Sequence, residues 1–203
     1  DTLLGGIGND LAFGGRDDDQ VFGSEGDDTL LGDRGSDTIF GGVGADTPVG
    51  RSGDRDLIFG NSGPDFINGS QGDDTIFGGK QNDAVFGGKD NDLLWGDLGD
   101  DSIQGDQGDD TLIGGTDNLL TIDRDGRDLL VGGAGADVVY GNNGNDALSG
   151  EDGNDSLYGG QDNDYAWGGN DQDLLFGDLA DDTLCGEAGD DTLIGGTGDI
   201  NRD

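Results

Sequence analysis

The sequence predicts an all-β solenoid of about ten stacked coils, each made of two short strands, so that two parallel sheets face each other. Three repeating features predict this fold. A glycine recurs every nine residues over almost the whole chain, an aspartate follows it five positions later, and an aliphatic residue follows two positions after that. Glycine supplies 46 of the 203 residues. That is about three times its average share and is typical of a backbone with many positive φ angles.

Residues 132–140 show the unit, which reads Gly-Gly-x-Gly-x-Asp-x-apolar-x. The first six residues are too rich in glycine and acid for a helix or strand, so they predict a turn. The last three predict a very short strand whose middle residue, the eighth of the unit, points inward. One such strand buries no core, so two units must form a coil and coils must stack about 4.8 Å apart. The eighth position is aliphatic nearly throughout, with Ala12, Pro48 and Ala166 as departures.

We expect a single domain over residues 1–203 with two interruptions. Residues 117–125, Asp-Asn-Leu-Leu-Thr-Ile-Asp-Arg-Asp, break the period. We interpret them as a loop that leaves the stack, and the alternative is a misaligned tenth unit. Pro48 has no N–H to donate to a sheet, and a ten-residue unit follows it. The sequence therefore predicts a local irregularity at residues 47–59.

The charge of the chain leaves two interpretations open. With 46 acidic residues against 9 basic ones, the formal net charge is −37. The chain is then either a disordered polyanion or a fold neutralised by bound cations. In the predicted solenoid, sixth-position aspartates of neighbouring coils lie above one another and repel. Calcium accepts carboxylate and backbone carbonyl oxygens, whereas the absence of His and the single Cys argue against zinc or copper.

We therefore expect many Ca2+ ions, about one per pair of stacked turns. About nineteen gaps, with one ion each, would carry about +38, close to the formal −37. The candidate metal ligands are Asp10, Asp19, Asp28, Asp37, Asp46, Asp56, Asp65, Asp74, Asp83, Asp92, Asp101, Asp110, Asp128, Asp137, Asp146, Asp155, Asp164, Asp173, Asp182 and Asp191.

Composition also argues against several functions. Nucleic acids and anionic membranes bind to basic patches, and no run approaches the length of a membrane span. We expect neither partner. Cys185 has no second cysteine to pair with. General acid–base chemistry without histidine would need a carboxylate in a pocket, and only repetitive turn aspartates are present, so we predict no enzymatic activity and no catalytic residues.

These tandem units resemble the RTX (repeats-in-toxin) nonapeptide family over essentially the whole chain. The resemblance implies a right-handed parallel β-roll, calcium held between successive turns on each side, folding on calcium binding, and export by type I secretion. It also implies that the sixth-position aspartates are the calcium ligands. Gln81 and Ala180 replace the fourth glycine, so these two units depart from the family pattern. Both ends of the sequence resemble the borders of the 117–125 insertion, so we expect either a piece of a longer array or copies joined head to tail.

The ninth positions of alternate units predict an outward row of large side chains on one sheet. An exposed row of this size would mark an interface, for lateral packing of rolls or docking onto another domain. The alternative is an aromatic ladder packed only on itself. The row consists of Phe22, Phe40, Phe59, Phe77, Trp95, Ile113, Tyr140, Tyr158 and Phe176.

The function that the sequence favours is an extracellular or cell-surface calcium-binding structural module, part of a surface layer, fibre or adhesin. We expect it to be secreted as part of a longer precursor and to associate with itself. The alternative is the calcium-triggered folding and secretion module of a larger secreted toxin or hydrolase. Ice binding is a weaker third hypothesis, because the outward threonines are scattered over both sheets.

Overall fold

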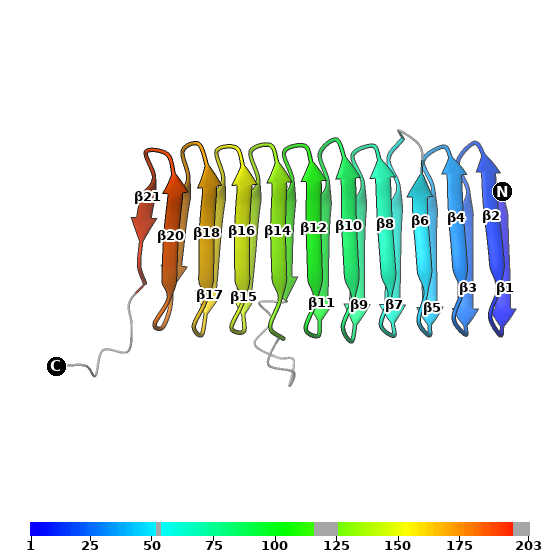
Figure 1. The fold of residues 1–203 in the computed structure, drawn as a ribbon. Coiled ribbons are helices and arrows are strands. Elements are labelled where there is room, and N and C mark those ends of the chain that lie inside the picture. Colours follow the sequence, from blue (N-terminus) through cyan, green and yellow to red (C-terminus); the bar gives the residue numbers. More distant parts are fainter. Residues whose placement is uncertain (52–53, 116–125, 197–203) are drawn as a thin grey trace.

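The computed structural model describes residues 1–51, 54–115 and 126–196. These residues form strands and turns without a helix, in an 11-stranded and a 10-stranded sheet (Figure 1). The first sheet contains β1 (Thr2–Ile7), β3 (Gln20–Glu25), β5 (Thr38–Val43), β7 (Leu57–Ser62), β9 (Thr75–Lys80), β11 (Leu93–Leu98), β13 (Thr111–Gly115), β15 (Val138–Asn143), β17 (Ser156–Gln161), β19 (Leu174–Asp178) and β21 (Thr192–Ile194). The second contains β2 (Leu11–Arg16), β4 (Thr29–Arg34), β6 (Thr47–Arg51), β8 (Phe66–Gln71), β10 (Ala84–Lys89), β12 (Ser102–Gln107), β14 (Leu129–Ala134), β16 (Ala147–Asp152), β18 (Tyr165–Asn170) and β20 (Thr183–Ala188).

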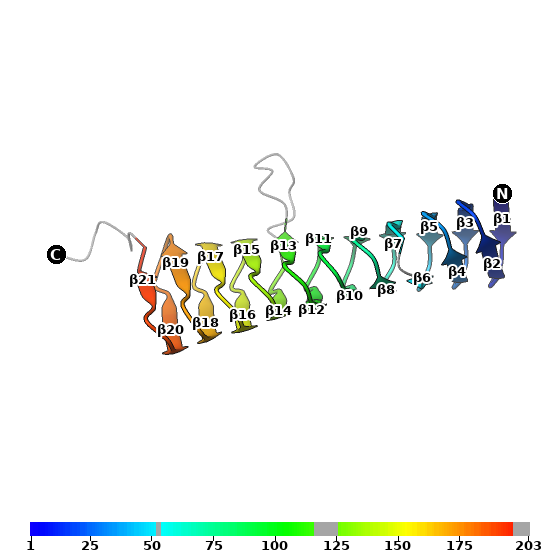
Figure 2. The ribbon, with the colours of Figure 1, turned by 90° about the horizontal axis from the view of Figure 1, so that it is seen from above.

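The chain alternates between the two sheets, so the prediction of an all-β solenoid with two parallel sheets is confirmed. Odd-numbered strands pair only with odd-numbered ones, and even with even, always in parallel. Val21 of β3, for example, is in register with Ile39 of β5, one coil and two units away. Figure 2 shows the two layers edge on, with the chain crossing from one to the other at every turn.

A single file of aliphatic side chains from the eighth positions fills the space between the sheets. Their exposed fractions are 0–1%. The file consists of Val21, Leu30, Ile39, Ile58, Ile67, Ile76, Val85, Leu94, Ile103, Leu112, Leu130, Val139, Leu148, Leu157, Ala166 and Leu175. Since the core is one side chain deep on each sheet, the turns contribute much of the buried interior.

The strands are longer than the three residues that the sequence pattern predicts. β9 runs from Thr75 to Lys80 and therefore includes the first three positions of the following turn unit. Its burial alternates through Ile76 and Gly78, which both face inward. The prediction that the first six residues all form a turn was wrong, because the inward alternation continues through the first glycine. Only the fourth to sixth residues make the reversal.

The two predicted interruptions differ in what the structure shows. The loop predicted at 117–125 lies outside the described residues, but the register across it changes from 18 to 27 residues, as in Ile103↔Leu130. The nine additional residues therefore add no unit to the ladder. At the other interruption, β6 pairs with β8 only through Val49↔Asn68. Pro48 has no N–H to donate to β8, which accounts for the pairing that is lost between β6 and β8.

Candidate metal centres

The turns stack along two edges of the solenoid. The turns that follow even-numbered strands form the upper edge in Figure 1, and those that follow odd-numbered strands form the lower edge. Each turn places its sixth-position aspartate inside. Those from Asp19 to Asp173 are 0–3% exposed, which is unusual for a carboxylate. The predicted ligands thus form two rows, one along each edge, which are buried except near the ends of the rod, where Asp10, Asp182 and Asp191 are half-buried.

Within each row, one oxygen of every carboxylate has a defined structural role. The Oδ1 atom of Asp74 accepts a hydrogen bond of 2.8 Å from the backbone N–H of Asp56, one coil earlier. The Oδ1 atom of Asp92 accepts the equivalent bond from Asp74 at 2.9 Å. The row continues across the insertion, where the Asp101 N–H donates to Asp128 at 2.8 Å. Each side chain therefore satisfies a turn amide of the preceding coil.

The second carboxylate oxygen, Oδ2, is buried along most of both rows and has no hydrogen-bond partner among the residues that the structure describes. A buried carboxylate oxygen without a partner costs several kcal/mol, and natural structures rarely keep one without a ligand. The same orphan recurs at the same position of the repeat in Asp10, Asp19, Asp28, Asp37, Asp46, Asp56, Asp65, Asp74, Asp83, Asp92, Asp101, Asp110, Asp137, Asp155, Asp164, Asp173 and Asp182.

These Oδ2 atoms lie against the first-position glycines. A Cβ built on Gly78 would lie 2.6 Å from Asp83 Oδ2 and 2.7 Å from the carbonyl oxygen of Gly96, in the next coil. At Gly5 the corresponding distances are 2.8 Å to Asp10 Oδ2 and 2.7 Å to the Gly23 carbonyl oxygen. A side chain at this position would therefore collide with the carboxylate. Glycine is required here for space, since the first-position glycines Gly5 and Gly78 are not among those with a positive φ.

Burial raises the pKa of Asp74, Asp83 and Asp92 to about 8, mainly through desolvation. The charges of Asp56 in the same row and of Asp73 and Asp90 at outer turn positions raise the pKa of Asp74 further, and the hydrogen bond from the Asp56 amide opposes both effects. Asp56, Asp65, Asp137 and Asp164 have their pKa raised to about 7 for the same leading reason. The rows thus favour either a proton or a bound cation on these carboxylates near neutral pH.

The donor set fits a hard divalent cation. Among the residues that the structure describes, no three His, Cys, Asp or Glu side chains cluster around one point. A metal would therefore be held by carboxylates of stacked turns together with backbone carbonyl oxygens, the ligand set that Ca2+ accepts at six to eight positions. Zinc and copper prefer nitrogen and sulfur ligands, and this set has none. When bound, the cation would supply charge compensation for the buried carboxylates.

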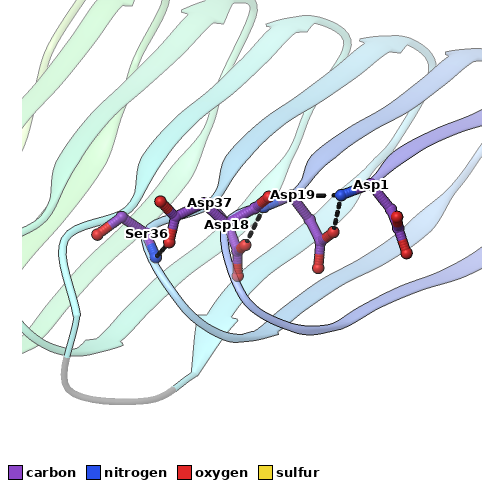
Figure 3. A network of polar contacts seen from close by, with 5 residues as sticks. All are labelled: Asp1, Asp18, Asp19, Ser36 and Asp37. Atoms are coloured by element: carbon purple, nitrogen blue, oxygen red, sulfur yellow. Dashed lines mark hydrogen bonds and ion pairs between the residues drawn. The ribbon is translucent and has the colours of Figure 1, made fainter.

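The structure also contains a row that the sequence analysis missed. Side chains at the fifth position accept hydrogen bonds from the next coil, as from Ser36 N–H to Asp18 Oδ1 at 3.0 Å. This direction is opposite to that of the sixth-position row, where Asp19 N–H donates forward to Asp37 Oδ1 at 2.8 Å (Figure 3). The recurrence of Asp and Asn at the fifth position was the available signal. Each edge therefore has a buried row and an exposed outer row of side-chain acceptors.

The predicted aromatic row lies on the sheet of odd-numbered strands and is packed on itself. Phe22, Phe40, Phe59, Phe77 and Trp95 stack with ring centroids 4.5–5.0 Å apart. Tyr140, Tyr158 and Phe176 form a second stack at 4.9–5.0 Å, and the half-buried Ile113 lies between the two. The faces of the inner rings are covered by their neighbours. The ladder interpretation thus describes the packing, and the predicted interface role remains a prediction.

No helix in the described ranges is long and apolar enough to cross a membrane.

A comparison with family models matches the RTX calcium-binding nonapeptide repeat, in groups of four copies, at residues 1–30, 13–48, 22–57, 51–85, 86–118, 123–157, 149–184 and 167–199. No curated protein sequence matches the chain. The matched segments cover nearly all of the chain and carry the glycines and aspartates of both rows. The chain belongs to the RTX calcium-binding nonapeptide repeat family.

Proposed function

We propose that this chain is a structural module that folds when Ca2+ enters the gaps between its stacked turns, with the sixth-position aspartates as ligands and about one ion per gap. The observation that carries this proposal is the recurrent buried Oδ2 atom without a hydrogen-bond partner, next to a backbone carbonyl of the next coil. In the metal-free chain, burial of so many carboxylates opposes folding. A divalent ion between two of them converts their repulsion into a link between coils.

The ladder determines how calcium affinity and folding are coupled. Each aspartate belongs to one coil through the backbone and to the preceding coil through its Oδ1 hydrogen bond. An ion that fixes one carboxylate therefore orders the next coil, and binding is cooperative along the rod. We expect an affinity on the order of 10⁻⁴–10⁻³ M per site, as in extracellular calcium modules. At cytosolic calcium the chain would stay unfolded and competent for secretion.

Circular dichroism tests this function directly. Metal-free protein should have little strand content, and millimolar calcium should restore it cooperatively. Magnesium at the same concentration should fail, because its small octahedral shell retains water. Strand content that is unaffected by a chelator would contradict the proposal.

The biological role that we favour is a secreted, non-catalytic part of a surface layer, fibre or adhesin. What supports it is the elongated shape of the rod and the half-buried aromatic row along one sheet. Lateral packing through the row predicts that Phe40→Ser, Phe77→Ser and Tyr158→Ser together abolish self-association in calcium. Electron microscopy of the loaded protein would show fibres or sheets, and dispersed rods would instead favour the folding and secretion module of a larger secreted toxin or hydrolase.

A further inference from the structure

Two exposed aromatic side chains lie outside the aromatic row. Tyr165 and Trp167 are on the outer face of β18, in the sheet of even-numbered strands, and are 52% and 38% exposed. Their rings are within 14° of parallel, with centroids 6.1 Å apart. The rings of the aromatic row are half-buried instead, because they stack on rings from adjacent coils. Tyr165 and Trp167, the aromatic pair, therefore present ring surface to solvent.

The strands on either side of β18 leave the aromatic pair uncovered. The residues in register with the pair are Ala147 and Ser149 on β16 and Thr183 and Cys185 on β20. These four side chains are short. The three adjacent strands (Figure 1) thus form an open face on which the two rings stand above small neighbours.

Carboxylates flank the aromatic pair on both sides. Gly169, two residues after Trp167 on the same strand, is in register with Glu151 of β16 and Glu187 of β20. Both glutamates are exposed. With strands about 4.8 Å apart and residues about 3.3 Å apart along a strand, their Cα atoms lie about 8 Å from that of Trp167. Both carboxylates are close enough to pair with cationic groups bound at the rings.

The charge around this face has a single sign. From Asp128 to Gly196 the sequence contains no lysine, arginine or histidine, so this segment supplies no counter-charge to the two glutamates. Asp152, next to Glu151, accepts a hydrogen bond of 2.6 Å from the Asn170 side chain, and this amide leaves the negative charge in place. Calcium on the inner rows would compensate the buried aspartates and not these exposed carboxylates.

Open aromatic rings beside unpaired negative charge are complementary to organic cations. The face of an aromatic ring attracts a guanidinium or ammonium group, and tryptophan does so most strongly. Guanidinium also stacks flat on rings and binds carboxylates through paired N–H groups. An anionic ligand would be repelled by the glutamates. An apolar partner would bury these carboxylates without a counter-charge.

We propose that this face of β16, β18 and β20 is a docking surface for an arginine-bearing basic segment of a partner protein. One guanidinium stacks on the aromatic pair, and further basic side chains of the same segment bind Glu151 and Glu187. The Cα atoms of these glutamates are about 9.6 Å apart, because they lie two strands apart. A single small cation would not contact both carboxylates, whereas a segment with several cationic side chains does.

The charge of the whole chain favours the same partner. A formal net charge of −37 attracts a basic segment from a distance and raises the rate of association. The aromatic pair then selects the place where the segment stays, because the other exposed carboxylates of this part of the rod have no exposed ring pair beside them. This inference goes beyond the proposed function and requires only that the rod is folded.

Fluorescence anisotropy of a labelled nona-arginine peptide, added to the full chain in millimolar calcium, tests the role of the rings. Tyr165→Ala with Trp167→Ser copies the residues that β16 has at these positions and should weaken binding about fivefold or more. Phe13→Ser is the matched control and should leave binding unchanged, because Phe13 is 51% exposed at the same repeat position of β2. Nona-lysine should bind about threefold or more weakly than nona-arginine, since ammonium stacks less well on rings. Binding that is indifferent to the loss of both rings would overturn the proposal.

Neutral substitutions separate this surface from general attraction to an acidic rod. Glu151→Gln with Glu187→Gln should weaken nona-arginine binding about fivefold or more. Glu25→Gln with Asp90→Asn removes the same charge from exposed positions away from the aromatic pair, and it should change the affinity less than about twofold. Equal losses in the two double variants would mean that the peptide reads only net charge, which contradicts a defined surface.

Tryptophan fluorescence locates the occupant. In a Trp95→Phe background, Trp167 is the only tryptophan, and nona-arginine should change its emission. Peptide binding without such a change would place the peptide elsewhere and overturn the proposal. A change caused by the neutral oligosaccharide cellohexaose and not by the peptide would assign the face to glycans. Self-association in calcium that Tyr165→Ala with Trp167→Ser abolishes would assign it to a second copy.

Circular dichroism of each variant in calcium separates this proposal from the proposed function. If calcium induces no strand content in the unsubstituted chain, the proposed function fails. If calcium induces strands and nona-arginine does not bind at Trp167, only the docking surface fails.

Discussion

Asp56 and Asp74, one coil apart on the upper edge, are joined by a hydrogen bond of 2.8 Å from the Asp56 amide to Oδ1 of Asp74. The other oxygen of Asp74 is buried and has no hydrogen-bond partner in the described part of the chain. One carboxylate thus performs two separable tasks. Oδ1 caps the turn of the preceding coil, and Oδ2 is available to a cation.

This separation predicts the effect of amide substitution. Asp110→Asn keeps an oxygen that can accept the amide of Asp92 but removes the charge, so it should destabilise the calcium-loaded fold by about 2 kcal/mol and raise the calcium midpoint. The matched control is Asp109→Asn, because Asp109 is exposed and its side chain accepts the Ala136 amide at 2.9 Å. Equal effects of the two substitutions on the midpoint would contradict the assignment of the inner row as ligands.

The first-position glycines predict a steric effect on the same row. Gly78→Ala would place a methyl group 2.6 Å from Asp83 Oδ2 and 2.7 Å from the Gly96 carbonyl oxygen, so we expect a loss of about 2–3 kcal/mol of calcium-loaded stability. Gly195→Ala is the control, because no atom of the described residues lies within 4 Å of the position that its methyl group would take. Thermal unfolding in saturating calcium measures both, and a tolerated Gly78→Ala would show that the row is loosely packed.

The pKa shifts predict how the metal-free chain responds to pH. Desolvation raises the folded-state pKa of Asp74, Asp83 and Asp92 to about 8, from the ordinary value of 3.8. The folded form therefore binds more protons, and this contribution to stability is complete below the unfolded pKa and is lost as pH rises through about 8. Strand content measured in a chelator should decrease as the pH is raised from about 4 to about 8.

Charge screening provides the control for that experiment. General repulsion among exposed acids also declines towards low pH, but salt screens this repulsion as well. Salt does not remove the desolvation cost of the buried carboxylates. High salt at a pH of about 8 should therefore fail to restore the strands that acid restores. Strand content that increases with pH in the metal-free chain would have the opposite sign and would contradict the burial of these groups.

The aromatic ladder predicts a position-dependent contribution to stability. Phe59 stacks on Phe40 at 4.9 Å and on Phe77 at 5.0 Å, so Phe59→Ala should cost about 2 kcal/mol, from two stacked pairs plus lost burial. Phe13 occupies the same repeat position on the other sheet and is 51% exposed, so Phe13→Ala should cost about 0.5 kcal/mol or less. If chemical denaturation showed equal losses in the free energy of unfolding for the two variants, aromatic stacking would add nothing to stability.

Much of the fold follows from the nine-residue period. The pairing of Val21 with Ile39, two units apart, is what a solenoid with two units per coil requires, and the eighth positions form the core as predicted. The length of the strands was not predictable from residue type. Gly78 has no side chain to show an inward alternation, and its burial depends on the carboxylate of Asp83 beside it.

The candidate site was predictable in composition but not in geometry. The repeat identified which aspartates would gather, yet the hydrogen bond from Asp56 to Asp74 depends on how far one coil lies above the next. The fifth-position row was missed because exposed Asp and Asn in turns are common for local reasons. Its members bind between coils instead, as Asp18 does with Ser36.

Small-angle X-ray scattering at neutral pH, with and without calcium, tests most directly whether the ion is part of the scaffold. For the metal-free chain we predict a radius of gyration near that of an unfolded polypeptide of this length, about 48 Å. Calcium should reduce it to about 17 Å, as for a rod of ten coils. A chelated sample that already scatters as the compact rod would contradict this account.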